Sequence, residues 1–108
     1  FEERFPEAIA ECERALKLDA GLGNPYNDIG AYLIELGRED EALPWFERAK
    51  NARRYHAGPQ SPYMNLARIY IQRGQWGKAL LELHVAEVFA PGDPRFALLL
   101  NQLRENIP

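Results

Sequence analysis

Few residues of this sequence carry side chains that could perform chemistry, and their spacing matches no catalytic or metal site. The two histidines, His56 and His84, have no cysteine or carboxylate at the spacing of metal ligands, so we predict no metal site. Cys12, the single cysteine, falls at an apolar position of a helical pattern and is interpreted as a small hydrophobic residue. No motif pairs a nucleophile with a base, so we expect no enzymatic activity and no cofactor.

Two further motifs have structural explanations. The Gly-Leu-Gly segment at 21–23 follows a predicted helix rather than a strand, and it lacks the third glycine and the lysine of phosphate-binding loops. The acidic run at 39–41 stands at a predicted helix start, where negative charge complements the helix dipole. The function class that remains is the recognition of a partner by a surface.

Composition narrows the class further. With 108 residues, 46% hydrophobic and 27% charged, the chain has the content of one soluble globular domain. The net charge of −3 argues against general attraction to nucleic acid or to an anionic membrane, and no apolar run approaches the roughly 20 residues that cross a bilayer. One cysteine gives no sign of an oxidising compartment, so the cytoplasm is the default expectation. Because the sequence begins at Phe1 and not at Met, we expect it to be an excerpt of a longer protein.

The elements that must position any surface are helices, and their pattern repeats. In the stretch 63–91, apolar or small residues recur at helical spacing on both sides of a break at Gly74. The second helix of the stretch includes Leu80 and Val88 in its apolar pattern. The same pattern lies 37 positions earlier, with Gly37 in the place of Gly74, and its second half recurs a further 34 positions back. A period in the mid-thirties with two helices per period is typical of a helical solenoid.

The repeated positions define the residues that we expect to pack the repeats together. They are Ala8, Cys12, Ala15, Tyr26, Ile29, Gly30, Leu33, Ala42, Phe46, Ala49, Tyr63, Leu66, Ala67, Tyr70, Ala79, Leu83, Ala86 and Pro91.

This spacing resembles the tetratricopeptide repeat, or TPR, which places a large apolar residue, Leu-Gly and Tyr on its A helix and Ala, an aromatic residue, Ala and Pro on its B helix. The copy at 63–91 fills all eight positions, with Ala67 for glycine and Leu83 for the aromatic residue. The copy that begins at residue 26 fills seven and has Arg54 where the family has proline. The first copy matches only the B half, with Cys12 at the aromatic position and Ala20 where proline is usual.

The resemblance implies an all-α fold, a right-handed superhelical solenoid of antiparallel helix pairs. We predict a single domain over 1–108 with four parts. They are a half repeat with only its B helix at 5–20, repeats at 24–54 and 61–91, and a capping helix at 94–107.

Local signals mark the expected helix starts and contacts. Asn24, Ser61 and Asp93 each precede a proline, so we expect each to cap a helix whose first residue is that proline. Gly30 lies inside a predicted helix, where glycine costs about 1 kcal/mol relative to alanine. We therefore expect a facing helix to approach closely here and at Ala67, which holds the same position in the next copy, with Ala42 and Ala79 facing them from the second helices of the repeats.

In the TPR family, the concave groove lined by the A helices binds peptides or partner segments. Carrying these positions over gives Asn27, Ala31, Ile34, Glu35, Met64, Arg68, Ile71, Gln72, Leu98 and Gln102. Met64, Ile71 and Leu98 are expected to lie off the packing stripe and to supply apolar contacts, while Arg68 and Asn27 supply directional ones. The hypothesis is a non-catalytic scaffold or adaptor that binds a protein segment, whose identity stays open.

One alternative is a scaffold that assembles with itself. The half repeat has no A helix, so Ile9, Cys12 and Leu16 would lack cover. Either a second copy of the chain, forming a homo-oligomer, or the rest of a longer protein would then complete the first repeat.

The other alternative is nucleic-acid binding through the basic segment Arg48, Lys50, Arg53, Arg54, Tyr55 and His56. Basic residues at the end of a helix also suit its dipole, and the domain is acidic overall. We therefore do not expect nucleic acid to be the partner, nor insertion into a membrane.

Overall fold

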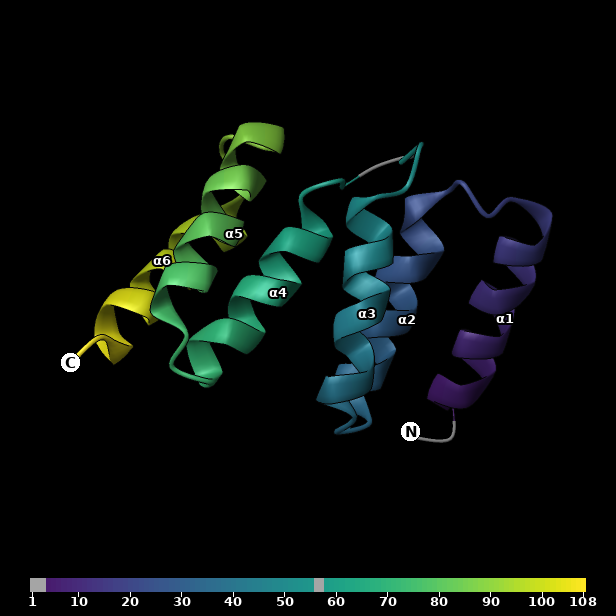
Figure 1. Ribbon diagram of the computed structural model, residues 1–108, viewed down its shortest axis with the longest axis horizontal. Coiled ribbons are helices and arrows are strands. Elements are labelled where there is room, and N and C mark those ends of the chain that lie inside the picture. Colours follow the sequence, from purple (N-terminus) through teal and green to yellow (C-terminus); the bar gives the residue numbers. More distant parts are fainter. Residues whose placement is uncertain (1–3, 56–57) are drawn as a thin grey trace. The chain divides into compact units, whose positions relative to one another are not determined.

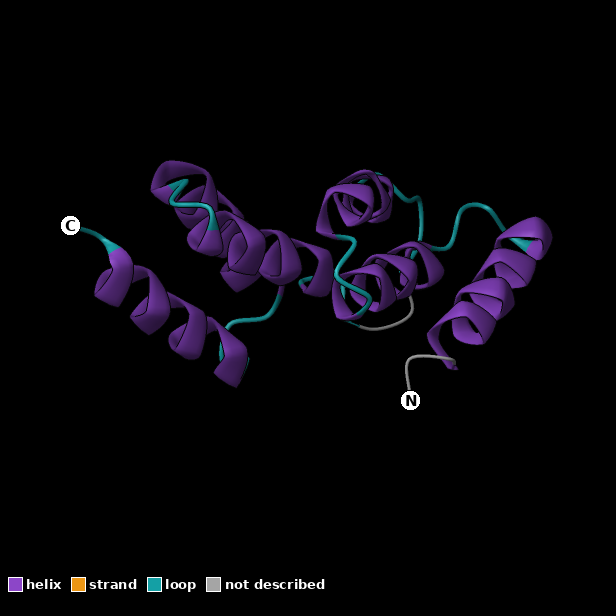
Figure 2. Cartoon of the chain, turned by 90° about the horizontal axis from the view of Figure 1, so that it is seen from below, coloured by secondary structure: helices purple, strands orange, loops and turns teal. Residues whose placement is uncertain are grey.

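The computed structural model describes residues 4–55 and 58–108, and over these residues it contains six α-helices and no strand (Figures 1 and 2). The helices are α1 (Arg4–Leu18), α2 (Gly23–Glu35), α3 (Glu39–Lys50), α4 (Ser61–Gln72), α5 (Trp76–Phe89) and α6 (Pro94–Asn106). The all-α prediction is confirmed, and the superhelical arrangement of the repeats stays a prediction. The helices form two compact units, of which the first ends at Gly58 and the second begins at Pro59.

The first unit is an antiparallel pair, α2 and α3, with α1 packed against α2 (Figure 1). Its core takes Ile29 and Leu33 from α2 and Ala42, Phe46 and Ala49 from α3, all almost fully buried. α1 contributes no fully buried residue along its described length. The repeat-packing positions on α1, namely Ala8, Cys12 and Ala15, are half-buried.

The second unit is the antiparallel pair α4 and α5, with α6 packed against both (Figure 1). Its hydrophobic core draws on all three helices. The members are Met64, Ala67 and Ile71 of α4, Ala79, Leu83 and Ala86 of α5, and Leu99 and Leu103 of α6. Leu66 is also fully buried, while the repeat tyrosines Tyr63 and Tyr70, like Tyr26 of the first unit, are half-buried. Pro91, expected to pack, is exposed beyond the end of α5.

The A helices of the two repeats, α2 and α4, end in the same way. Gly37 and Gly74 adopt φ of +76° and +72°, the left-handed conformation that glycine adopts without strain. The Gly37 N–H donates to the Ile34 carbonyl over 2.9 Å, and the next N–H, of Arg38, donates to the Leu33 carbonyl over 2.8 Å. The corresponding pair of hydrogen bonds follows Gly74, so each A helix closes in a Schellman motif. The predicted break at these two glycines is confirmed.

The predicted helix starts are right at one place and wrong at two. Asp93 caps α6, and its side chain accepts a hydrogen bond from the Arg95 N–H. α4 begins at Ser61 itself, because the Ser61 hydroxyl accepts a hydrogen bond from the Arg95 guanidinium rather than capping. α2 begins at Gly23, one residue before Asn24, and the Gly23 N–H donates to the Arg54 carbonyl over 2.8 Å. At both α2 and α4, tertiary hydrogen bonds accompany a helix start that differs from the predicted one.

The buried face of α5 differs from the sequence pattern. Leu80 and Val88 were expected on the packing face, but they are 42% and 80% exposed. α5 is apolar on nearly all sides, so several stripes could have faced the core. The stripe that faces it is the one with the small residues Ala79 and Ala86 around Leu83. Small residues allow the neighbouring helices to approach, which explains the choice.

We predict that Gly30→Ala destabilises the chain by about 1 kcal/mol or more. The added Cβ would stand 2.6 Å from Cε1 of the Phe46 ring, and that ring is fully buried and cannot swing into solvent. Overpacking costs about 1–3 kcal/mol, which exceeds the helix propensity of up to about 1 kcal/mol that alanine gains over glycine. Urea denaturation followed by circular dichroism measures the difference.

The matched control is Gly77→Ala, an exposed helical glycine of α5 whose added Cβ meets no atom within 4 Å. It should leave the free energy of unfolding unchanged or raise it by up to about 1 kcal/mol. If Gly30→Ala stabilised the chain as the control does, the contact between α2 and α3 would be wrong.

We also predict a pH-dependent role for Asp93. Its hydrogen bonds with Arg95 and Gln60 hold the pKa of its carboxyl well below the usual range. Because the folded-state pKa is depressed, this stabilisation is complete above a pH of about 4 and is lost as the pH falls towards the folded-state pKa.

The substitution Asp93→Ala should therefore cost about 1 kcal/mol of unfolding free energy at neutral pH, the usual contribution of an N-cap. The gap between the wild type and Asp93→Ala should narrow steadily as the pH is lowered below about 4. Asp93→Asn keeps a capping oxygen without the charge and should lie between them. A gap that does not change with pH would rule out an ionised Asp93 as the source.

Candidate partner-binding site

In the first unit, the predicted groove residues lie along one side of α2 but differ in accessibility. Ala31 and Ile34 are half-buried and Glu35 is exposed. Asn27 is only 9% exposed, and its side chain forms a hydrogen bond with the Asp28 carboxylate. Asn27 therefore helps to hold its neighbour, and Ala31, Ile34 and Glu35 form the part of this side that a partner could contact.

In the second unit, the structure separates the predicted groove residues into two groups. Met64 and Ile71 are 2% and 5% exposed and belong to the core with Leu99 and Leu103, so the expectation that they lie off the packing stripe is wrong. The reason is α6, which packs against α4 and covers them. Sequence spacing within α4 alone carries no sign of that cover.

The other predicted positions of the second unit remain accessible. On α4, Arg68 is half-buried and Gln72 is exposed. On α6, Leu98 is 59% exposed and Gln102 is exposed. Because residues four apart lie on the same face of a helix, Arg68 and Gln72 together form one polar stripe of α4, which we call the α4 stripe. Its guanidinium and amide groups can donate hydrogen bonds to the carbonyls or carboxylates of a bound segment.

The charge of Asp28 on α2 affects the pKa values of several neighbouring side chains, and the sequence analysis did not predict this role. Loss of water around its carboxylate raises its pKa, and the hydrogen bond from Asn27 opposes that rise. Burial raises the pKa of the Cys12 thiol, and the negative charge of Asp28 raises it further. Burial followed by the same charge also raises the pKa of Tyr32 and of Tyr55. A single aspartate in a helix has no sequence signal that would reveal these neighbours.

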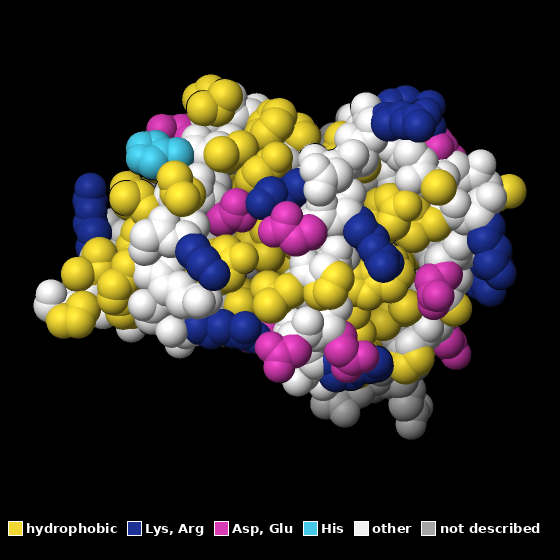
Figure 3. Space-filling model, viewed as in Figure 1, with side chains coloured by type: hydrophobic (Ala, Val, Ile, Leu, Met, Phe, Trp, Pro, Cys, Tyr) yellow, Lys and Arg dark blue, Asp and Glu magenta, His cyan; other side chains and the backbone are white. Residues whose placement is uncertain are grey.

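An exposed apolar stripe on α5 was also missed. Leu81, Val85 and Val88 are spaced by four and three residues, the spacing of one helical face, and Leu81 is 68% exposed. Hydrophobic side chains reach the surface over this helix (Figure 3). The stripe lies opposite the buried one on the same helix, so it takes no part in the core of the second unit.

Two classes of site have no support within the described ranges 4–55 and 58–108. No three histidine, cysteine or acidic side chains there gather into a group that could hold a metal ion. No described helix is both long enough and apolar enough to cross a bilayer. His56, part of the basic segment considered for nucleic acid, lies outside the described residues.

Residues 26–63 match the family model of the tetratricopeptide repeat, a segment that comprises α2 after its first turn, all of α3 and the start of α4. No curated protein matches the chain. The family match covers the pair in which Gly30 meets Phe46.

Because α1 packs against α2, we predict that the pKa of the Cys12 thiol depends on the charge of Asp28. Replacing Asp28 by asparagine removes the charge that repels the thiolate, so the pKa of the Cys12 thiol should fall towards its ordinary value. The rate of alkylation by iodoacetamide as a function of pH measures that pKa, and Cys12 is the only thiol in the chain.

Two further variants calibrate this measurement. Glu13→Gln should lower the pKa less than Asp28→Asn, because Glu13 has the smaller effect on the thiol. Glu35→Gln, at an exposed carboxylate at the end of α2, should leave the pKa unchanged. A larger shift for Glu13→Gln than for Asp28→Asn would mean that α1 packs on α2 in another register.

Proposed function

We propose that this chain, whose residues 26–63 match the tetratricopeptide repeat family, is a non-catalytic module that binds a segment of a partner protein on its A helices. Tetratricopeptide repeats are, in general, protein–protein interaction modules. The family therefore supports the class of function, and the accessible side chains of the A helices supply the finer part of the proposal.

The observation that carries the proposal is the division of α4 into two faces. Its core face, with Met64, Ala67 and Ile71, is covered by α5 and α6. The α4 stripe, Arg68 and Gln72, takes no part in that core. Arg68 carries five N–H donors in a planar group, which suits the backbone carbonyls and carboxylates of a peptide. We propose that the stripe provides the directional contacts to the partner.

In the second unit, the proposal adds the accessible residues Leu98 and Gln102 of α6 to the α4 stripe. In the first unit, the accessible residues of α2, Ala31, Ile34 and Glu35, form a separate candidate surface. Met64 and Ile71 drop out of the contact set because they are buried. The apolar share of the interface is therefore smaller than the sequence pattern predicts, and hydrogen bonds must supply more of the specificity.

Self-assembly is the second candidate function, and the incomplete burial of α1 favours it. No described residue of α1 is fully buried. A groove of about 380 Å³ beside it is lined by the hydrophobic residues Pro6, Ile9, Leu33, Leu36 and Trp45 and by the charged residues Glu13, Arg38 and Glu41. A helix from a second copy, or from the rest of a longer protein, would cover the hydrophobic residues of this groove and complete the first repeat.

The test is affinity capture from a lysate of the source cell, with the wild-type chain beside Arg68→Glu and Gln72→Glu. We expect a partner that the wild type retains and that both variants lose. Gln72 is exposed, so its variant should fold even if the half-buried Arg68 does not tolerate the change; circular dichroism verifies folding. Arg14→Glu makes the same charge change on the exposed surface of α1 and should retain the partner.

Recovery of the same proteins by all of these variants would show that binding does not use the α4 stripe. A mass that rises with protein concentration in light scattering, together with no captured partner, would favour the self-assembling scaffold.

A further inference from the structure

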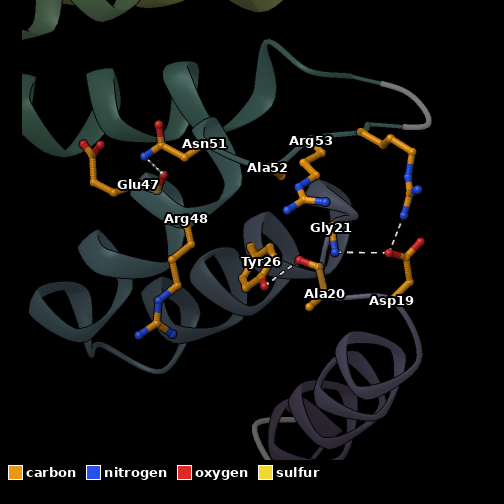
Figure 4. Close-up of a pocket in the computed structure, with 10 residues that line it drawn as sticks. Asp19, Ala20, Gly21, Tyr26, Glu47, Arg48, Asn51, Ala52 and Arg53 are labelled. Carbon is orange, nitrogen blue, oxygen red and sulfur yellow. Dashed lines mark hydrogen bonds and ion pairs between the residues drawn. The ribbon is translucent and has the colours of Figure 1, made fainter.

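A pocket of about 570 Å³ opens in the first unit, apart from the α2 residues that the proposed function uses. It lies where the connection between α1 and α2 meets the last turn of α3 and the residues that follow it (Figure 4). Three of its lining residues are arginines, Arg48, Arg53 and Arg54. The concentration of positive charge is notable because the whole chain has a net charge of −3.

The rim of this pocket is held in place by backbone hydrogen bonds between segments far apart in the sequence. The Gly23 N–H donates to the Arg54 carbonyl over 2.8 Å, and the Arg54 N–H donates to the Gly21 carbonyl over 3.0 Å. The Asp19 carboxylate accepts from the Gly21 N–H over 3.1 Å and forms an ion pair with Arg54. Since Arg53 adjoins this bridge, its backbone position is fixed before any ligand arrives, which lowers the entropy cost of binding.

Aromatic side chains support the second arginine. The Tyr26 hydroxyl donates to the Ala20 carbonyl over 2.8 Å, and the Tyr26 ring lies 6.2 Å from the Trp45 ring. The Arg48 guanidinium lies over Trp45, 4.8 Å from the ring centroid. In Figure 4, Arg53 points toward Tyr26 and Gly21, while Arg48 extends on the other side of Tyr26.

The acidic side chains of the pocket are already engaged. Asp19 forms its ion pair with Arg54, and Glu47 forms one with Lys50, with 3.4 Å between the charged atoms. Within the part of the chain that the structure describes, neither Arg48 nor Arg53 forms an ion pair. Two positive charges therefore remain uncompensated at a concave surface, which favours an anionic ligand.

We propose that this pocket binds anionic groups carried by a peptide, carboxylates or phosphates, through the guanidinium groups of Arg48 and Arg53, which lie on different sides of Tyr26 (Figure 4). A guanidinium offers paired N–H donors that match the oxygens of both anions, and such charge-assisted hydrogen bonds are among the stronger ones in proteins. The site is independent of the α4 stripe and does not rest on the proposed function. Nucleic acid fits less well, because two arginines in one pocket do not form the basic stripe that follows a phosphate backbone.

Fluorescence anisotropy with labelled peptides tests the proposal. The probes are an octapeptide with two glutamates, the same peptide with two phosphoserines, the same peptide with two glutamines, and a single-stranded DNA oligonucleotide. We expect the wild-type chain to bind one or both anionic peptides at least tenfold more tightly than the glutamine peptide. A preference between glutamate and phosphoserine then distinguishes a carboxylate from a phosphate as the source of the anion.

The variants Arg48→Gln and Arg53→Gln should each weaken the binding of the anionic peptide by about tenfold or more, the range for hydrogen bonds to charged groups. Arg104→Gln, on the exposed surface of α6, removes the same charge and should leave the affinity unchanged. The peptide experiment depends on Arg48 and Arg53 and the lysate experiment depends on the α4 stripe, so a failure of this pocket and a failure of the proposed function are distinguishable.

Several outcomes would overturn the proposal. If the glutamine peptide bound with the same affinity as the anionic peptides, the pocket would not recognise an anionic group. An unchanged affinity in both Arg48→Gln and Arg53→Gln, with circular dichroism showing folded protein, would place the binding elsewhere. The oligonucleotide could also bind more tightly than either peptide, with an affinity that falls steeply with added salt and is lost in both variants. The ligand of the pocket would then be a nucleic acid and not a peptide.

Discussion

The close contact between the A and B helices of a pair is the constraint on which the rest of the structure depends. In the first pair, Gly30 leaves room for the Phe46 ring, and no side chain larger than hydrogen fits without a shift. In the second pair, Ala67, Ala79 and Ala86 are all fully buried. Small residues let the helices approach, and close packing then contributes dispersion and hydrophobic stabilisation across the whole interface.

That constraint also decides which side chains are left for recognition. Once the small-residue face of α4 is directed at α5, Met64 and Ile71 come under α6, and the α4 stripe of Arg68 and Gln72 stays outside the core. On α4, the surface proposed for a partner is therefore polar where the sequence pattern predicts apolar contacts. A polar surface of this kind obtains its specificity from the direction of hydrogen bonds rather than from the area it buries.

The two units differ in how their ends are secured. In the second unit, Asp93 joins the starts of α4 and α6 through Gln60 and Arg95, and this network gives α6 a fixed N-terminus. In the first unit, a backbone bridge between residues 22 and 54 ties the end of the α2–α3 pair to the connection from α1. The bridge fixes the rim of the arginine pocket, so a feature that stabilises the fold also positions the charges proposed for binding.

The sequence by itself determined the helices, their period and the glycines that end the A helices, because helical spacing and a left-handed φ depend on a few neighbouring residues. Gly37 and Gly74 were predicted as breaks for that reason. Only the tertiary structure decided which stripe of α5 is buried, that α6 covers Met64, and that α2 and α4 start without a side-chain cap. The arginine pocket belongs to the same class, since residues 19–21 and 48–54 meet through contacts of long sequence separation. Such contacts depend on the packing of whole helices, and local spacing carries no information about them.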